Sequence, residues 1–186
     1  MVNKVLFVTQ NITDSAAYRT DMQNLGDLEG VGTLRWVGDK CYRWVQNRHS
    51  AAVAAGHVVT HLAANAANMF KWVTIPAAVD YATIAGVVAS TSIAVGTSGA
   101  SYVDGGYGWV QVVGYSSTCS VANGTATIAV GATLMPAVGL YVSAEASTAL
   151  NTAPKHRWSI TLLEAYAATT TTVAAPTAMK VLLNCL

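Results

Sequence analysis

Two histidines four residues apart, His57 and His61, are the first residues whose spacing suggests chemistry. On a helix this spacing places both imidazoles on one face, where they can bind zinc. The intervening residues Val58, Val59 and Thr60 favour a strand, which separates the two rings by roughly 13 Å at about 3.3 Å per residue. No glutamate follows His57 in the H-E-x-x-H pattern of zinc proteases. We therefore expect two ordinary histidines, no metal ion and no cofactor.

A glycine-rich stretch at residues 105–109 reads GGYGW and ends in Trp109. Phosphate-binding loops space their glycines differently and lead into a helix. Here a β-prone run follows, so we expect a tight turn into a strand. The chain also lacks the G-x-S-x-G motif of serine hydrolases, and its few acidic residues form no pair typical of acid–base catalysis. The sequence therefore predicts no catalytic residues and a protein that is not an enzyme.

Five tryptophans offer a different kind of site, because exposed indole rings stack on sugars or bases. Three of them, Trp36, Trp44 and Trp109, lie inside β-prone runs, where such large rings more often pack in a core or a subunit interface. We therefore favour packing, and we expect Trp109 to anchor its strand through burial. A carbohydrate-binding β module remains an alternative function.

Scarcity of charge is the most unusual property of the composition. Charged residues make up 10% of the chain, and Asp104 is the one charged residue between Tyr81 and Ala144, whereas about a quarter is typical of globular domains. A lone monomer would be poorly covered by so few charges, so we expect much of the surface to be buried against other subunits. The net charge of +1 indicates no basic surface for nucleic acid.

No segment has the character of a membrane span or a secretion signal. Residues 121–142 are uncharged, but glycine, proline and asparagine interrupt them, whereas a span needs about 20 mostly apolar residues. The first eight residues lack the features of a signal peptide. The three cysteines, Cys41, Cys119 and Cys185, are an odd number without C-x-x-C spacing, so we expect free thiols in a reducing compartment.

Short β-prone runs separated by turn residues dominate the chain from residue 32 onward. Residues 33–37 and 41–45 alternate in character around a turn at 38–40, which predicts a hairpin. Residues 50–56 favour either a helix or a loop, and residues 63–70 favour a short helix. Further strands are expected at 58–62, 73–76, 84–89, 108–113, 126–130, 140–143, 159–163 and 179–183. This pattern predicts an all-β domain over residues 31–186, a small sandwich, roll or barrel of short antiparallel strands.

Residues 1–30 differ from the rest and predict an extended N-terminal arm. They contain one short apolar run, formed by Val5, Leu6, Phe7 and Val8, followed by a polar stretch with little periodicity. Such a segment cannot offset its ordering entropy alone, so we expect it to gain order by lying on another surface, a neighbouring subunit or a capsid. These four residues and Trp109 are the predicted interface residues.

Six stretches of the chain have a recognisable order, namely LRWVGDKCYRWV at 34–45, AAVAAGHVV at 51–59, AGV at 85–87, GYGWVQVVG at 106–114, VGATL at 130–134 and VLLNC at 181–185. This order resembles the decoration, or cement, proteins of tailed-bacteriophage capsids, in which a G-x-Y/F-G-W-V-Q-V-x-G strand precedes a strand, a turn and a V-G-x-x-L step. The resemblance implies a small all-β subunit, often trimeric, that binds the outside of a capsid lattice. It implies no catalytic residues, and it does not extend to residues 1–30.

The sequence thus leads us to expect a virion structural protein that decorates and stabilises a phage capsid across neighbouring capsid subunits. Its expected partners are the major capsid protein and further copies of itself, most simply a homotrimer, with no nucleic acid and no membrane. It would be made in the host cytoplasm and reside on the capsid surface of the virion. The alternatives are another virion subunit, from a tail, a fibre or a minor capsid position, and the carbohydrate-binding module.

Overall fold

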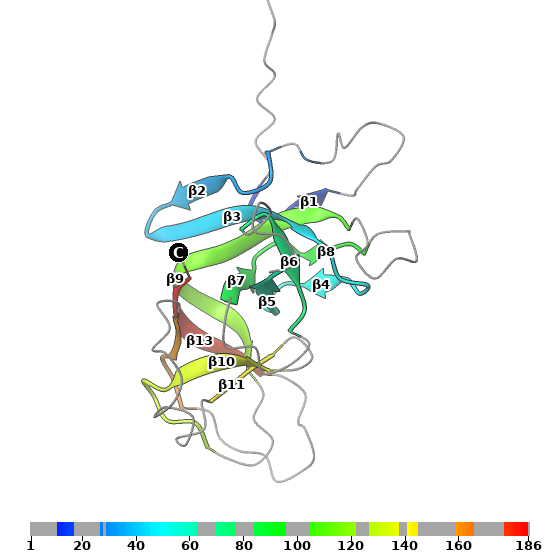
Figure 1. The fold of residues 1–186 in the computed structure, drawn as a ribbon. Coiled ribbons are helices and arrows are strands. Elements are labelled where there is room, and N and C mark those ends of the chain that lie inside the picture. The colour runs from blue at the N-terminus through cyan, green and yellow to red at the C-terminus, as the bar shows by residue number, and fades with distance from the viewer. Residues whose placement is uncertain are drawn as a thin grey trace, which may run out of the picture.

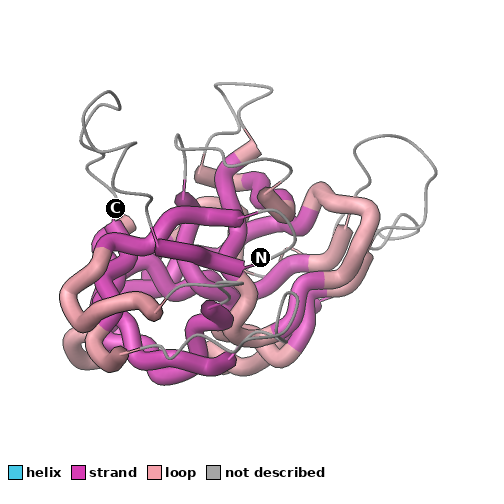
Figure 2. The backbone as a smooth tube through the Cα atoms, turned by 90° about the horizontal axis from the view of Figure 1, so that it is seen from below, coloured by secondary structure: helices cyan, strands magenta, loops and turns pink. Residues whose placement is uncertain are grey.

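The computed structural model describes residues 11–16, 27, 29–62, 70–76, 84–95, 105–121, 127–137, 141–144, 159–165 and 177–185. These residues form an all-β fold without a helix, in which strands joined by loops wind around a common interior (Figure 2). Within them there is consequently no helix with the length and hydropathy to cross a bilayer. The strands are β1 (Ser15–Ala16), β2 (Leu34–Val37), β3 (Lys40–Asn47), β4 (Val53–Ala54), β5 (Val58–His61), β6 (Trp72–Thr74), β7 (Ile84–Val88), β8 (Ser92–Ile93), β9 (Tyr107–Val121), β10 (Thr133–Ala137), β11 (Tyr141–Ala144), β12 (Ser159–Leu162) and β13 (Thr177–Asn184).

The predicted hairpin at residues 33–45 is confirmed by β2 and β3. The two strands pair antiparallel, with Leu34 opposite Arg43 and Val37 opposite Lys40. Gly38 adopts a φ of 62° in the connecting turn, a conformation that glycine reaches at little cost and that suits tight hairpin turns.

Strand β9 is the longest strand and connects the two halves of the molecule. Its first part pairs with β3 and β7, and its second part pairs with β13 (Figure 1). The sequence predicted only residues 108–113 of this strand, because Gly114 has the character of a turn residue. In the structure Gly114 has a φ of 97° and a Cβ there would lie 2.8 Å from the Asp39 carbonyl oxygen. The glycine therefore bends a continuous strand instead of ending it.

Strand pairing closes into two rings that share β9. One ring runs β9–β7–β5–β6–β3 and back to β9, and the other runs β9–β13–β12–β10–β11 and back to β9. Most pairs are antiparallel as expected, but β3–β6 and β9–β11 are parallel. Ring closure leaves no free edge within either ring. Strand β2 lies outside them, bonded to β3 alone among the described strands.

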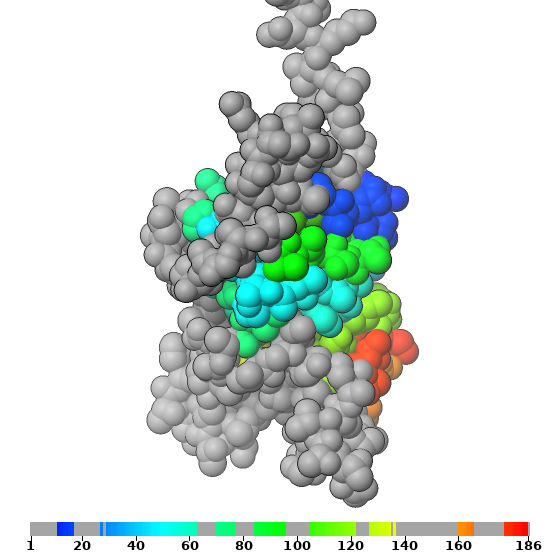
Figure 3. Space-filling model, turned by 90° about the vertical axis from the view of Figure 1, so that its right-hand side faces the viewer, coloured from blue at the N-terminus to red at the C-terminus, as the bar shows by residue number. Residues whose placement is uncertain are grey.

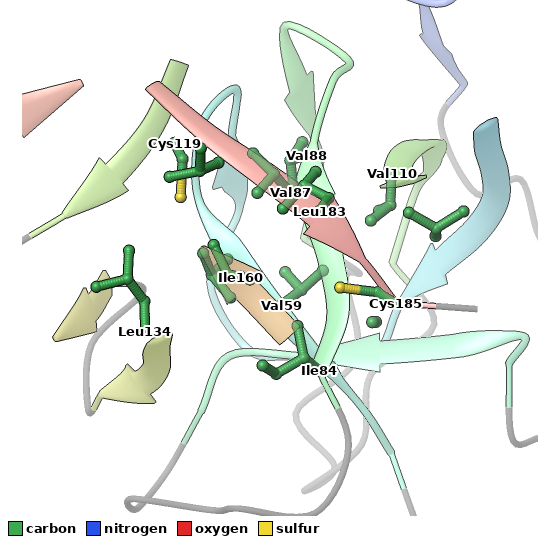
Figure 4. Packing of buried hydrophobic residues seen from close by; sticks show 14 of the residues in the cluster. Val59, Ile84, Val87, Val88, Val110, Cys119, Leu134, Ile160, Leu183 and Cys185 are labelled. Atoms are coloured by element: carbon green, nitrogen blue, oxygen red, sulfur yellow. The ribbon is translucent and has the colours of Figure 1, made fainter. Parts of the chain in front are cut away.

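An aliphatic core fills the interior of the fold. Side chains from both rings converge on it, among them Val59 of β5, Val110 of β9, Ile160 of β12 and Leu183 of β13 (Figure 4). Cys41, Cys119 and Cys185 belong to the same cluster as buried free thiols. Burial raises the pKa of Cys119 and of Cys185 to about 12, so these thiols stay protonated and behave as small apolar residues.

Several local predictions are wrong. Of the two alternatives for residues 50–56 the helix is wrong: they form a loop that contains the two-residue strand β4, and the chain then turns at Gly56 with a φ of 86°. Residues 127–130, predicted as part of a strand, form only an isolated bridge at the buried Ile128, and a turn begins at Val130. Strands β8 and β10 form where none was expected. Apart from Phe70, the predicted helix at 63–70 lies outside the described residues, as does residue 126.

Candidate assembly surface

A cluster of four aromatic side chains covers the outer face of β3 and β9. Alternate residues of a strand share a face, so Trp44 and Trp109 stand on this outer face while Val45 and Val110 point into the aliphatic core. The Trp44 and Trp109 rings lie 5.1 Å apart between centroids, and Trp44 stacks on Tyr107 at 6.3 Å. Tyr42 completes this group, which we call the aromatic cluster.

The N-terminal segment covers the aromatic cluster. Strand β1 pairs antiparallel with β9, with Ser15 opposite Gly108 and Ala16 opposite Tyr107, and Ile12 and Ala16 pack against the aromatic rings. In Figure 3 these residues, drawn in blue, lie against the green surface formed by the β7–β8 part of the chain. The described residues 11–16 of the predicted arm therefore lie on the chain's own sheet.

The Ser90 side chain attaches this segment to the sheet. Its hydroxyl is fully buried, donates to the Asp14 carbonyl oxygen at 2.6 Å and accepts from the Trp109 backbone N–H at 2.7 Å. The neighbouring Thr91 N–H donates to the Thr13 carbonyl oxygen at 2.9 Å. One serine thus links the N-terminal segment to the central strand and gives the buried Trp109 N–H the partner that a buried backbone group needs.

Two acidic residues connect the aromatic cluster to the β2–β3 hairpin. The Trp44 indole N–H donates to Asp27 at 2.8 Å, and Glu29 forms an ion pair with the Arg35 guanidinium. That guanidinium also lies over the Trp109 ring, 4.4 Å from its centroid, in a cation–π contact. Arg35 is the second residue of β2, so these contacts hold the strand in place from its inner side.

The other residues of β2 have exposed side chains, unlike Arg35. Leu34, Trp36 and Val37 are 44%, 58% and 50% exposed, and we call this strand with its three exposed apolar side chains the β2 edge. Figure 1 shows β2 at the outer side of β3, with no other strand of the described residues bonded to it. The arrangement is unusual, because proteins normally protect edge strands with charged residues or proline, and here the one charge, Arg35, is directed to Trp109.

A second polar group lies inside the first ring. Arg43 is buried, its Nη1 lies 3.3 Å from His61 Nε2, and its guanidinium lies 4.8 Å from the centre of the Phe70 ring. Burial and the Arg43 charge together lower the pKa of His61 to about 4, so the imidazole is neutral near pH 7. Arg43 has no carboxylate partner in the part of the chain described here, and an arginine that stays charged offers no acid–base chemistry.

The histidines predicted not to bind metal have separate partners. His57 Nδ1 accepts the Ala54 N–H at 3.2 Å, while His61 contacts Arg43. No three His, Cys, Asp or Glu side chains in the described ranges gather as a metal site would require.

The predicted interface residues fall into two groups. Val5, Leu6, Phe7 and Val8 lie outside the described residues. Trp109 is fully buried in the aromatic cluster, so its predicted burial is confirmed, and it supports the β2 edge through Arg35. Its proposed place at an interface stays a prediction.

Sequence reasoning did not find the β2 edge, although it found the hairpin. The alternation of residues 34–37 shows which side chains share a face, but only the structure shows that Leu34, Trp36 and Val37 are exposed and that no described strand other than β3 pairs with β2. Nothing in the sequence marked Ser90 as the residue that holds the N-terminal segment.

No family model, curated protein or solved structure matches this chain. The function therefore has to be argued from the residues and the geometry described above.

Proposed function

We propose that this chain is a virion structural protein that decorates and stabilises a tailed-phage capsid by binding across neighbouring capsid subunits. The observation that carries the proposal is the β2 edge, a rigidly held strand with three large exposed apolar side chains. Contiguous exposed apolar residues mark surfaces that other proteins cover. The resemblance of residues 32–186 to decoration proteins supplies the class of partner.

The mechanism would be mechanical. Each copy contacts more than one capsid subunit, and contacts that are weak singly become strong when they are engaged together. The ion pair and cation–π contact of Arg35 hold the β2 edge before binding, so less conformational freedom is lost on association. The low charge of the chain suits this role, because charged residues are depleted at the centres of protein interfaces.

The proposed partners are the major capsid protein and further copies of this chain, in a homotrimer on the outer capsid surface. Another virion subunit, from a tail, a fibre or a minor capsid position, uses the same kind of surface and is the nearest alternative.

A carbohydrate-binding module is the second alternative, and the exposure of Trp36 favours it. Its neighbour on the strand argues against it, because sugar recognition needs polar groups beside the aromatic ring to orient the ligand, whereas the β2 residue that shares the face of Trp36 is the apolar Leu34. Trp44 and Trp109 are buried and present no face to a ligand. Titration with oligosaccharides while following tryptophan fluorescence separates the two functions, since a decoration protein gives no saturable change.

Co-sedimentation with capsids assembled without this protein tests the proposal. We expect the purified chain to pellet with the capsids and to saturate at a fixed ratio to capsid subunits. The Trp36→Asp variant should pellet less, because it places a charge in the β2 edge, while Val130→Asp, at a residue 60% exposed elsewhere on the surface, should pellet normally. A wild-type chain that stays in the supernatant would refute the proposal.

A further inference from the structure

We propose that the β2 edge is the acceptor for residues 5–8 of a second copy of this chain, which bind antiparallel to β2 as an additional outer strand. The inference rests on the proposed function, since both use the β2 edge: here a second copy covers that edge, and Trp36→Asp then weakens capsid binding because the joined copies no longer engage the shell together. It goes further by naming the segment and the surface that join two copies.

The β2 edge has the properties of an acceptor strand. Its backbone is bonded on one side, to β3, among the described strands, so its outer N–H and C=O groups are available to another strand. Main-chain hydrogen bonds at such an edge supply affinity, and alternate side chains supply specificity. Leu34 and Trp36 on one face and Val37 on the other provide apolar contacts on both sides.

Residues 5–8 match this edge in length and chemistry. They read VLFV, an uncharged apolar run in which the two valines and the phenylalanine favour a strand. The run has four residues, as does β2. In an antiparallel register with Val8 opposite Leu34, Leu6 lies opposite Trp36. Aliphatic and aromatic side chains facing each other across strands stabilise such pairs.

Charge supports the same register. Continued past the end of β2, this register places Lys4 opposite Gly38, beside Asp39 in the β2–β3 turn. Lys4 is the one charged residue among positions 1–10, and Asp39 is exposed in the turn. Opposite charges near one another across a strand pair add to its stability and help to set its register.

The path along the sheet favours a second copy as the source of the occupant. Four strand spacings, about 19 Å measured along the curved sheet, lie between β1 and a new strand outside β2 in the order β1–β9–β3–β2. The hydrogen bond from the Asp14 N–H to the Asn11 carbonyl oxygen, at 2.9 Å, fixes the chain just before β1. Only residues 9 and 10 then lie between the apolar run and Asn11, and three peptide steps span about 11 Å.

The direction of the strands leads to the same conclusion. Strand β1 is antiparallel to β9, β9 to β3 and β3 to β2, so a segment antiparallel to β2 runs parallel to β1. Parallel strands of one sheet need a crossover connection of about a dozen or more residues. The six residues 9–14 are too few for such a connection within one chain.

Two complementary variants test the proposal. A chain lacking residues 2–10 keeps the β2 edge and loses the donor segment, whereas Trp36→Asp keeps the donor and charges the edge. Each variant should have the monomer mass in sedimentation velocity. Mixed in equal amounts they should form a heterodimer, because one intact donor then meets one intact edge, while a chain carrying both changes should associate with neither itself nor the wild type.

Controls distinguish a variant that has lost the contact between copies from one that has lost its fold. Val130→Asp should associate as the wild type does, and both variants should keep the wild-type near-ultraviolet circular dichroism, to which the buried Trp44 and Trp109 contribute. If either variant has lost that spectrum, an engineered Leu6→Cys and Trp36→Cys pair in the full chain replaces it. A disulfide that links two chains on a denaturing gel supports the inference, and one that forms within a chain overturns it.

Other results would overturn the inference as well. It is wrong if each single variant keeps the wild-type oligomer mass, or if folded variants stay monomeric on mixing. Capsid co-sedimentation of the wild-type chain is measured separately. Capsid binding without self-association through residues 5–8 would support the proposed function and overturn this inference. Self-association through residues 5–8 without capsid binding would support this inference and overturn the proposed function.

Discussion

Trp109 and Trp36 have opposite environments although both lie in strands of the same sheet. Trp109 is fully buried between Trp44 and the Arg35 guanidinium, whereas Trp36 is 58% exposed. The residue type is the same, so the two positions separate the contribution of burial to stability from that of the indole ring itself.

Substitution of the two tryptophans by alanine should therefore give unequal losses. Trp109→Ala should lower the free energy of unfolding by about 3–5 kcal/mol, since a large buried ring is removed, and Trp36→Ala should change it by roughly 0.5 kcal/mol or less, as at most exposed sites. Urea unfolding of both variants measures the difference. Equal losses would mean that the Trp109 ring is not in the core.

The buried His61 predicts a dependence of stability on pH. Its pKa falls from 6.5 to about 4 in the folded chain, because burial and the Arg43 charge both disfavour the imidazolium. Between these two values the unfolded chain binds a proton that the folded chain does not, so stability is complete above pH 6.5 and is lost as the pH falls toward 4. The loss should approach about 3 kcal/mol, at 1.36 kcal/mol per pKa unit.

The His61→Gln variant cannot titrate and should show a flatter stability profile between pH 6.5 and 4. Burial also lowers the pKa of His57, which acts in the same direction, so some slope should remain. His57→Gln is therefore the matched control, and a slope that disappears only in that variant would contradict the assignment.

The three cysteines should not react with alkylating reagents in the folded protein. All are buried and unpaired, and burial raises the pKa of each thiol, which removes the reactive thiolate. Alkylation at pH 8 should modify none of them in buffer and all three in denaturant without prior reduction, as counted by mass spectrometry. A single modified thiol in denaturant would indicate a disulfide.

At the scale of elements, the N-terminal segment is the clearest departure from expectation. Residues 1–30 were predicted as an arm that gains order on another surface, and for residues 11–16 that surface is the chain's own β9 and its neighbours. The hydrogen bond of Asp27 to Trp44 adds a second attachment. The division of the chain at residue 30 stays a prediction. Residues 5–8 of the predicted arm remain the segment proposed to bind the β2 edge of a second copy.

Ser90→Ala tests the attachment of this segment to β9. The change leaves the buried Trp109 N–H without its side-chain partner, and an unsatisfied buried group costs about 1–3 kcal/mol. The Asp14 carbonyl also loses its partner but belongs to an exposed residue, so its loss should cost less. Ser117→Ala, at an exposed position of the same long strand β9, is the control and should change stability little. Comparable losses at both positions, measured by thermal unfolding, would show that the Ser90 bridge contributes nothing specific.

At the scale of the whole molecule, the closure of the strands into rings determines which strand edges can pair with another chain. Among the described strands, β2, β1 and the two-stranded β4–β8 sheet lie outside the two rings. Of these, β2 is the strand that carries large exposed apolar side chains. A composition with 10% charged residues leaves such an edge without strong repulsion between copies.

We accordingly expect an oligomer in solution, most simply a trimer. The apolar β2 edge favours burial against other subunits, and so does the stretch from Tyr81 to Ala144, in which Asp104 is the one charged residue. Sedimentation equilibrium at micromolar concentrations should give a mass about three times that of one chain. A monomer mass throughout that range would contradict this expectation and the further inference together, whereas capsid binding would still have to be tested.

The sequence by itself determined the all-β class, the β2–β3 hairpin and the burial of Trp109, because each depends on local alternation of side chains and on turn residues such as Gly38. Only the tertiary structure decided that β9 continues through Gly114, that pairing closes twice around it and that residues 11–16 lie on β9. Alternation shows which residues share a face, but pairing between distant strands decides what covers that face. For the same physical reason Trp109 is buried and Trp36 is exposed.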